Sequence, residues 1–146
     1  MATERRAQGR NRNSAKRAGA AFEIQQAEYL REALENPYIS RQDKNGDKDL
    51  GDIAYVGYKG MGVNGVPITY ECKNTASINL TSATREAHAE AKNYQDKHGG
   101  PLPIALVAHK RHGVAVPEKQ WITMEAGELV RLLQVAEGVD SKSFGE

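Results

Sequence analysis

Three charged residues on two neighbouring strand-like segments are the part of this sequence best suited to chemistry. Asp52 lies in residues 51–56, and Glu71 and Lys73 lie in residues 68–74. Carboxylates are hard oxygen donors, which suit Mg²⁺ or Mn²⁺. A lysine beside them can orient or deprotonate a water molecule, or offset the charge of a phosphate. These residue types therefore indicate a metal site that can accept a phosphate group, provided that the fold brings them together.

A hairpin would bring them together. The glycine-rich stretch at residues 59–65 predicts a tight turn between two antiparallel strands. A hairpin centred on this turn places Asp52 directly across from Glu71. Opposed residues on an antiparallel pair lie on one face with Cβ atoms about 5 Å apart. Lys73, two residues beyond Glu71, shares that face. The alternative interpretation is a solvated sheet face, on which charged residues alternate without a catalytic role.

The flanking elements follow from periodicity and from capping residues. A helix is predicted from Ala15 to Glu35, capped by Asn13 or Ser14, and Glu23 lies near its apolar edge. The later elements are a short strand at 38–40 before the hairpin, a helix at 82–98 capped by Thr81 or Ser82, an apolar strand at 104–108, a short strand at 114–117, and a helix capped by Thr123 and closed by Gly138. The apolar strand is expected to be central and buried on both faces.

This order of elements predicts an α/β fold with a mixed central sheet and helices on both faces. The 146 residues are expected to form one domain at residues 15–138, with a flexible basic arm at 1–14 and a loose tail at 139–146. Trp121 is expected in the core or in a lid, with a base-stacking platform as the alternative.

The single cysteine, Cys72, cannot form an intrachain disulfide, and no Cys/His spacing fits zinc. Its side chain is expected to point into the core, opposite to Glu71 and Lys73. No apolar run reaches membrane-spanning length, so no membrane association is expected. A reducing, cytoplasmic setting is therefore predicted.

Positive charge gathers at the N-terminus, although the formal net charge is only +1. Residues 1–19 hold one acid, Glu4, and six basic residues: Arg5, Arg6, Arg10, Arg12, Lys16 and Arg17. Such an arm is predicted to lie along nucleic-acid phosphates. A solubilising tail and a mitochondrial presequence are the alternatives, whereas a secretory signal is excluded because no apolar stretch is present. Lys110 and Arg111, after the apolar strand, are further candidate phosphate contacts.

The acidic loop at residues 41–50 resembles a calcium-binding loop only superficially. Lys48 stands where the turn requires glycine, and Ala54 stands where the last ligand should be glutamate. This loop is therefore expected to be solvated and to lead into Asp52.

The order Asp52, hairpin, Glu71-x-Lys73 resembles the core of the PD-(D/E)xK nuclease superfamily, and within it the small Holliday junction resolvases of archaeal and phage type. The resemblance includes the helix with Glu23, the helix after the Glu-x-Lys strand and the apolar strand that runs into Lys110, and so spans roughly residues 16–133. Two positions differ from the family pattern. Gly51 replaces the proline of the Pro-Asp pair, and Asn74 stands where a small hydroxyl residue often follows the lysine.

The resemblance implies a restriction-endonuclease-like core and a Mg²⁺- or Mn²⁺-dependent endonuclease that hydrolyses DNA phosphodiester bonds, most closely a Holliday junction resolvase. Asp52, Glu71 and the backbone carbonyl of Cys72 would hold the metal, and Glu23 would support a second metal or its water. Lys73 would position the attacking water. Cutting a four-way junction on two symmetric strands implies a C2 homodimer. The alternatives are a superfamily nuclease acting on linear DNA, restriction-type or exonucleolytic, a non-catalytic DNA-binding module and a structural domain.

Overall fold

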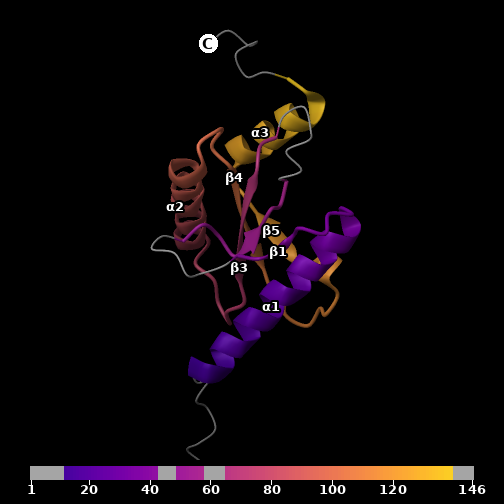
Figure 1. The fold of residues 1–146 in the computed structure, drawn as a ribbon. Helices are drawn as coiled ribbons and strands as arrows, with labels where there is room; N and C mark the ends of the chain where they lie inside the picture. The colour runs from indigo at the N-terminus through magenta and orange to yellow at the C-terminus, as the bar shows by residue number, and fades with distance from the viewer. Residues whose placement is uncertain (1–11, 43–48, 58–64, 140–146) are drawn as a thin grey trace, which may run out of the picture.

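The protein is described by a computed structural model over residues 12–42, 49–57 and 65–139. Within these residues, one sheet has the strand order β1-β2-β3-β4-β5 and is flanked by helices (Figure 1). The elements along the chain are α1 (Arg12–Ala33), β1 (Ser40–Arg41), β2 (Ile53–Ala54), β3 (Ile68–Lys73), α2 (Leu80–His98), β4 (Ile104–His109), the 3₁₀ turn η2 (Pro117–Lys119), β5 (Trp121–Thr123) and α3 (Ala126–Glu137).

The sheet is mixed. The pairs β1–β2, β2–β3 and β4–β5 are antiparallel, whereas β3 and β4 are parallel and α2 makes the crossover between them. The predicted α/β class, with a mixed sheet between helices, is confirmed. Strand β4 is buried along Ile104–Ala108 with a strand on each side, as its continuous apolar sequence predicted.

The register of the predicted hairpin is also confirmed. Ile53 of β2 pairs with Tyr70 of β3, which is the register that sets Asp52 across from Glu71. The backbone N–H of Asp52 donates to the Tyr70 carbonyl at 3.1 Å. Residues 58–64, which include most of the predicted turn, lie outside the described residues.

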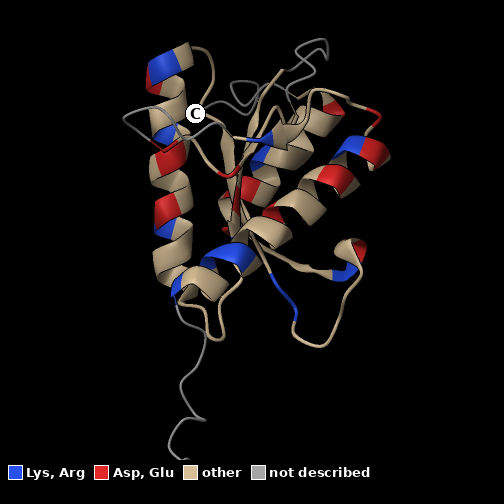
Figure 2. Cartoon of the chain, turned by 60° about the horizontal axis from the view of Figure 1, so that its bottom comes forward, with Lys and Arg blue, Asp and Glu red and all other residues tan. Residues whose placement is uncertain are grey.

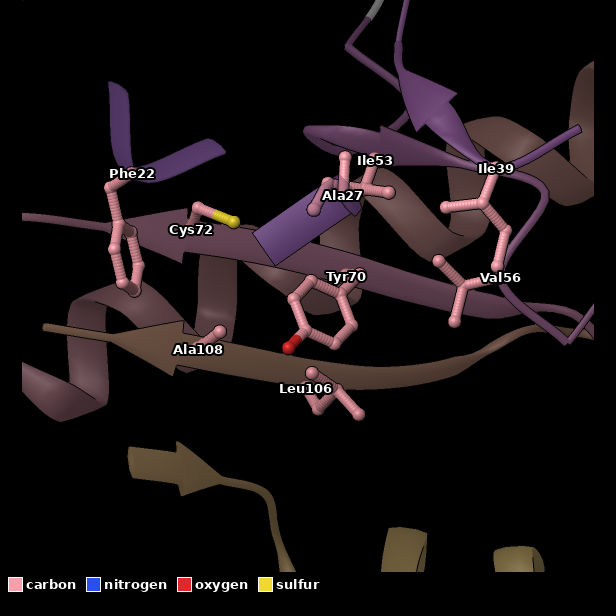
Figure 3. Close-up of a cluster of buried hydrophobic side chains, with 9 residues drawn as sticks. All are labelled: Phe22, Ala27, Ile39, Ile53, Val56, Tyr70, Cys72, Leu106 and Ala108. Atoms are coloured by element: carbon pink, nitrogen blue, oxygen red, sulfur yellow. The ribbon is translucent and has the colours of Figure 1, made fainter. Parts of the chain in front are cut away.

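Two apolar clusters, one on each face of the sheet, decide where the site lies. Figure 3 shows the first, in which Phe22 of α1 lies over Cys72 and Ala108 while Tyr70 lies beside Leu106. The second packs α2 against the other face, through Ala83, Ala87, Ala91, Ala105 and Val107. Because successive strand residues alternate between faces, the even-numbered residues of β3 face α1 and the odd-numbered ones face α2. The predicted core position of Cys72 is confirmed.

Several predicted helix caps are corrected. Helix α1 begins at Arg12, so Asn13 and Ser14 lie inside the helix instead of capping it. Asn79, not Thr81 or Ser82, caps α2, because its side-chain oxygen accepts the Ser82 N–H at 2.9 Å.

The region after β4 also differs from expectation. Pro117 opens a 3₁₀ turn where a strand was predicted, because proline suits the first position of a helical turn. Thr123 belongs to β5, and Glu125 is the residue before α3. Gly138 ends α3 with φ at 71°, the left-handed conformation that glycine tolerates, as predicted. Among the described residues no helix combines the length and apolar character needed to cross a membrane.

Candidate active site

Acidic side chains from three segments meet on the face of the sheet that α2 covers. Glu71 of β3 and Glu90 of α2 are 3% and 2% exposed. Carboxylate oxygens of Glu71, Glu90 and the exposed Asp49 all lie within 4.8 Å of one another. In Figure 2 acidic red segments appear inside the sheet, between the two long helices. The alanines of α2 allow this approach, because small side chains let the helix pack closely on the strands.

Asp49 is held at the mouth of this group by backbone contacts. Its Oδ1 accepts the Gly51 N–H at 3.0 Å, and its carbonyl accepts from Asn93 Nδ2 of α2 at 2.9 Å. Gly51 has a φ of 104°, and a Cβ there would come within 3.2 Å of Thr69. A glycine therefore fits this close approach to β3.

Asp52 lies beside the acidic group, buried at 5% exposure. Its Oδ2 accepts the Cys72 backbone N–H at 2.8 Å. Its carboxyl also interacts with Glu71 and helps to raise the pKa of that group. The structure therefore brings the predicted pair Asp52 and Glu71 together. The cluster whose oxygens could all reach one ion, among the described residues, is nevertheless Asp49, Glu71 and Glu90.

Burial dominates the electrostatics of this cluster. Loss of solvation, and then the close approach and charges of Asp52 and Glu90, raise the pKa of Glu71 far above its ordinary value. Burial also raises the pKa of Glu90. The close approach of Glu71 opposes that rise in pKa, and the charges of Asp49, Asp52 and Glu86 add to it. Without a cation, the pair is therefore expected to hold a proton at neutral pH.

The buried oxygens of this pair fit a cation. Glu71 Oε1 and both carboxylate oxygens of Glu90 are buried and meet no donor group among the described residues. The two carboxylates can bond to each other only if one of them is protonated. A divalent cation could replace that proton, and hard carboxylate oxygens are the ligands that Mg²⁺ and Mn²⁺ prefer. The donor set therefore fits the predicted metal.

Lys73 borders the acidic group. Its Nζ lies 2.7 Å from Glu86 Oε2 and 3.8 Å from Glu71 Oε2. Burial alone would lower its pKa, but the hydrogen bond to Glu86 and the charges of Glu71, Glu86 and Asp52 outweigh burial and raise the pKa. A lysine that stays protonated is suited to hold water or phosphate oxygens by donation, and unsuited to accept a proton.

Glu23 has a different partner from the one expected. Helix α1 packs on the Tyr70 and Cys72 face of the sheet, opposite to the face that carries Glu71. Glu23 Oε1 accepts from Arg41 Nε at 3.1 Å and Nη2 at 3.0 Å. It does not belong to the potential metal-binding group found among the described residues. At the end of β3, Asn74 Nδ2 donates to the Ala18 carbonyl of α1 at 3.2 Å.

The predicted DNA contacts lie at several places. Arg5, Arg6 and Arg10 are outside the described residues, whereas Arg12, Lys16 and Arg17 are exposed on the first turns of α1. Figure 2 shows a blue stretch after β4, where Lys110 and Arg111 follow each other. Lys110 Nζ donates to the carbonyls of Arg111 and Val114 within its own loop. Arg111 lies over the Trp121 ring, 4.3 Å from its centroid.

Three residues of this site were missed by the sequence analysis: Asp49, Glu86 and Glu90. Glu86 and Glu90 are four residues apart, which sets both on one side of α2 and next to the alanines that meet the sheet. This four-residue spacing could have predicted that both acids face the sheet. Asp49 was assigned to a solvated loop because the loop fails the calcium-binding pattern.

Comparison with known proteins gave no match to a family model, to a curated protein or to a solved structure.

Proposed function

We propose that this chain is a metal-dependent DNA endonuclease with a restriction-endonuclease-like core, most closely a Holliday junction resolvase. The observation that carries the proposal is the buried Glu71–Glu90 pair beside Asp52 and Lys73. Three of its carboxylate oxygens, Glu71 Oε1 and both of Glu90, meet no donor group among the described residues. Burying two carboxylates side by side destabilises a fold unless protons or cations compensate them. A purely structural role gives no reason for such an arrangement, whereas a metal site does.

The proposed roles follow from the contacts. The resemblance implies a metal held by Asp52, Glu71 and the Cys72 carbonyl. The geometry groups Glu71 with Asp49 and Glu90 instead. Glu71 belongs to both ligand sets. A bound Mg²⁺ or Mn²⁺ would polarise the scissile phosphodiester and offset the charge that develops on it. Lys73, protonated, would hold the attacking water and a phosphate oxygen. Glu86 would restrain the lysine ammonium until the substrate arrives.

The DNA would extend from this site over basic surfaces. The arm and the exposed start of α1 supply contacts to phosphates, which give affinity without reading bases. Two symmetric cuts require two active sites, so we propose a homodimer. Exposed apolar side chains of α3, at Leu129, Val130 and Leu133, offer a surface for a second copy.

The testing experiment is a cleavage gel. Labelled four-way junction and linear duplex of the same sequence are incubated with the protein in Mg²⁺, in Mn²⁺ or in EDTA. Metal-dependent cutting of the junction is expected. Asp52→Asn and Glu71→Gln should lose cleavage, because each removes a proposed carboxylate ligand of the metal. Both should keep or tighten DNA binding, because neither adds negative charge near the phosphate. Glu32→Gln, at an exposed acid of α1, is the matched control.

Each possible result of the gel has a defined meaning. Normal cleavage by Asp52→Asn or by Glu71→Gln would refute the proposed site. Equal cutting of linear duplex would refute the junction preference and leave a nuclease. Absence of cutting on either substrate in either metal would overturn the enzymatic proposal.

A further inference from the structure

A row of three side chains crosses the end of the sheet, from the proposed catalytic lysine to an aromatic ring. Lys73 of β3 pairs with His109 of β4, and His109 pairs with Trp121 of β5. Paired residues lie on the same face of a sheet, so all three project toward the α2 side. Neighbouring strands lie about 4.8 Å apart. Trp121 therefore lies two strand spacings from Lys73 across the sheet, which is about 10 Å.

This row borders a cavity of about 310 Å³. Its walls are the segment after β3 and the loop after β4, and its lining includes Lys73, Thr75, Ser77, Arg111, His112 and Trp121. The volume is at the lower end of the range found for small-molecule pockets. A cavity of this size suits one nucleotide better than an extended ligand.

Contacts among the described residues hold the two walls in place. His112 Nε2 lies 3.1 Å from the Thr75 carbonyl, which joins the two segments. Gln120, only 8% exposed, accepts the Arg111 N–H at 2.7 Å and donates to the Val114 and Val116 carbonyls. The cavity is thus formed before any ligand arrives, which lowers the entropic cost of binding.

The lining has the chemistry of a nucleotide site. Trp121 is 49% exposed, although a tryptophan on a sheet face would ordinarily be covered. Arg111 lies over its ring, 4.3 Å from the centroid. Indole and guanidinium planes are the surfaces on which unpaired bases stack. Hydrogen bonds to the edge of a base can come from the hydroxyls of Thr75 and Ser77. A phosphate can be held by the cations of Lys73 and Arg111.

We infer that this cavity binds the base of an unpaired nucleotide, which stacks on Trp121, next to the phosphate held at Lys73. The position of that phosphate rests on the proposed function, whereas the base site rests on the cavity itself. A base inside a duplex is stacked on its neighbours and cannot enter. The cavity would therefore favour DNA with an unpaired nucleotide beside the cut, as at a branch point or a strand end.

Trp121 is the only tryptophan of the chain, so its fluorescence reports on this site directly. The probes, added in EDTA to prevent cleavage, are a short oligothymidylate, the same strand with abasic sites, and a blunt duplex of equal length. Saturable quenching by oligothymidylate is expected, with much weaker quenching by the other two. Equal quenching by the abasic strand would overturn the base site, because phosphates alone would then explain binding.

Variants measured by anisotropy of labelled oligothymidylate complete the test. Trp121→Ala should weaken binding about 5- to 150-fold, the range that follows from stacking of one base, and Trp121→Phe should keep most of the affinity. Ile122→Ala is the matched control, since Ile122 is 45% exposed on the same strand and points to the other face. Unchanged affinity in Trp121→Ala, with its melting temperature preserved, would refute the inference.

The two proposals can fail separately. Base-dependent quenching by a protein that cuts no DNA would keep the cavity assignment and remove the nuclease. Metal-dependent cleavage without base-dependent quenching would keep the nuclease and remove the base site.

Discussion

Replacing Glu71 with glutamine is expected to stabilise the metal-free protein at neutral pH. Glu71 is 3% exposed. Burial, and then its neighbours Asp52 and Glu90, raise its pKa far above the ordinary value. Folding without metal therefore requires uptake of a proton. Glutamine has nearly the same shape as a protonated carboxyl and needs no proton, so the variant avoids this cost.

The magnitude follows from the pH and the ordinary pKa. That pKa is 4.5, which lies 2.5 pH units below pH 7, and each unit corresponds to about 1.36 kcal/mol. Protonating one glutamate at pH 7 thus costs about 3.4 kcal/mol. This cost is the same for any pKa above 7 in the folded state. At pH 5 the cost is below about 1 kcal/mol.

The sign of the pH dependence is fixed by the direction of the pKa shift. Because the folded pKa is raised, the folded state binds more protons than the unfolded state above pH 4.5. The stability contribution of the protonated carboxyl is present below that pH. It is lost as the pH rises, at about 1.4 kcal/mol per pH unit for one proton. The Glu71→Gln variant should lack this slope.

Thermal unfolding followed by circular dichroism in EDTA, from pH 5 to pH 8, measures the difference. For a chain of this size, about 3 kcal/mol corresponds to a melting temperature roughly 6–12 °C higher at pH 7, with little difference at pH 5. Glu32→Gln should follow the parent at every pH. A Glu71→Gln variant that is no more stable than the parent at pH 7, or whose advantage does not change with pH, would rule out a protonated Glu71 in the metal-free fold.

Three further predictions concern catalysis, DNA binding and assembly. Lys73→Ala should slow cleavage by about 10²–10⁴-fold and leave the Mg²⁺-induced rise in melting temperature intact. A single-turnover cleavage rate within a fewfold of the parent would contradict the proposed role of Lys73. Deleting residues 1–11, which keeps all of α1, should flatten the log–log salt dependence of junction binding by roughly 0.9 for each lost phosphate contact, and an unchanged slope would make the arm a passive tail. Leu133 is 49% exposed on α3, and Leu133→Glu should shift the mass measured by light scattering from dimer to monomer without lowering the melting temperature. A parent protein that is already monomeric would remove the dimer from the proposal.

The hairpin could be predicted from the sequence because its determinants are local. The glycine-rich turn centres the register, and the alternation of side chains along β3 sets Cys72 in the core and Glu71 opposite to it. The register of Ile53 with Tyr70 and the core position of Cys72 confirm both expectations. The sheet class followed in the same way from the order of helices and strands.

The complete acidic group could not be predicted because it depends on tertiary packing. Helix α2 meets the sheet through its alanines, and this packing sets Glu90 beside Glu71. Glu23 was expected near the metal, but α1 packs over Tyr70 and Glu23 lies beside Arg41. Similarly, the face of the sheet on which Trp121 lies is set by its pairing with His109 across β4 and β5.

Calorimetric titration with Mn²⁺ at pH 7, in two buffers of different ionisation enthalpy, tests the metal site at Glu71 and Glu90 most directly. Saturable binding is predicted, with release of about one proton as the cation replaces the proton held by the pair. Glu71→Gln and Glu90→Gln should each lose most of the binding, whereas Glu32→Gln should bind as the parent does. Absence of binding by the parent, or equal binding by the parent and both cluster variants, would contradict a metal centre at these buried acids.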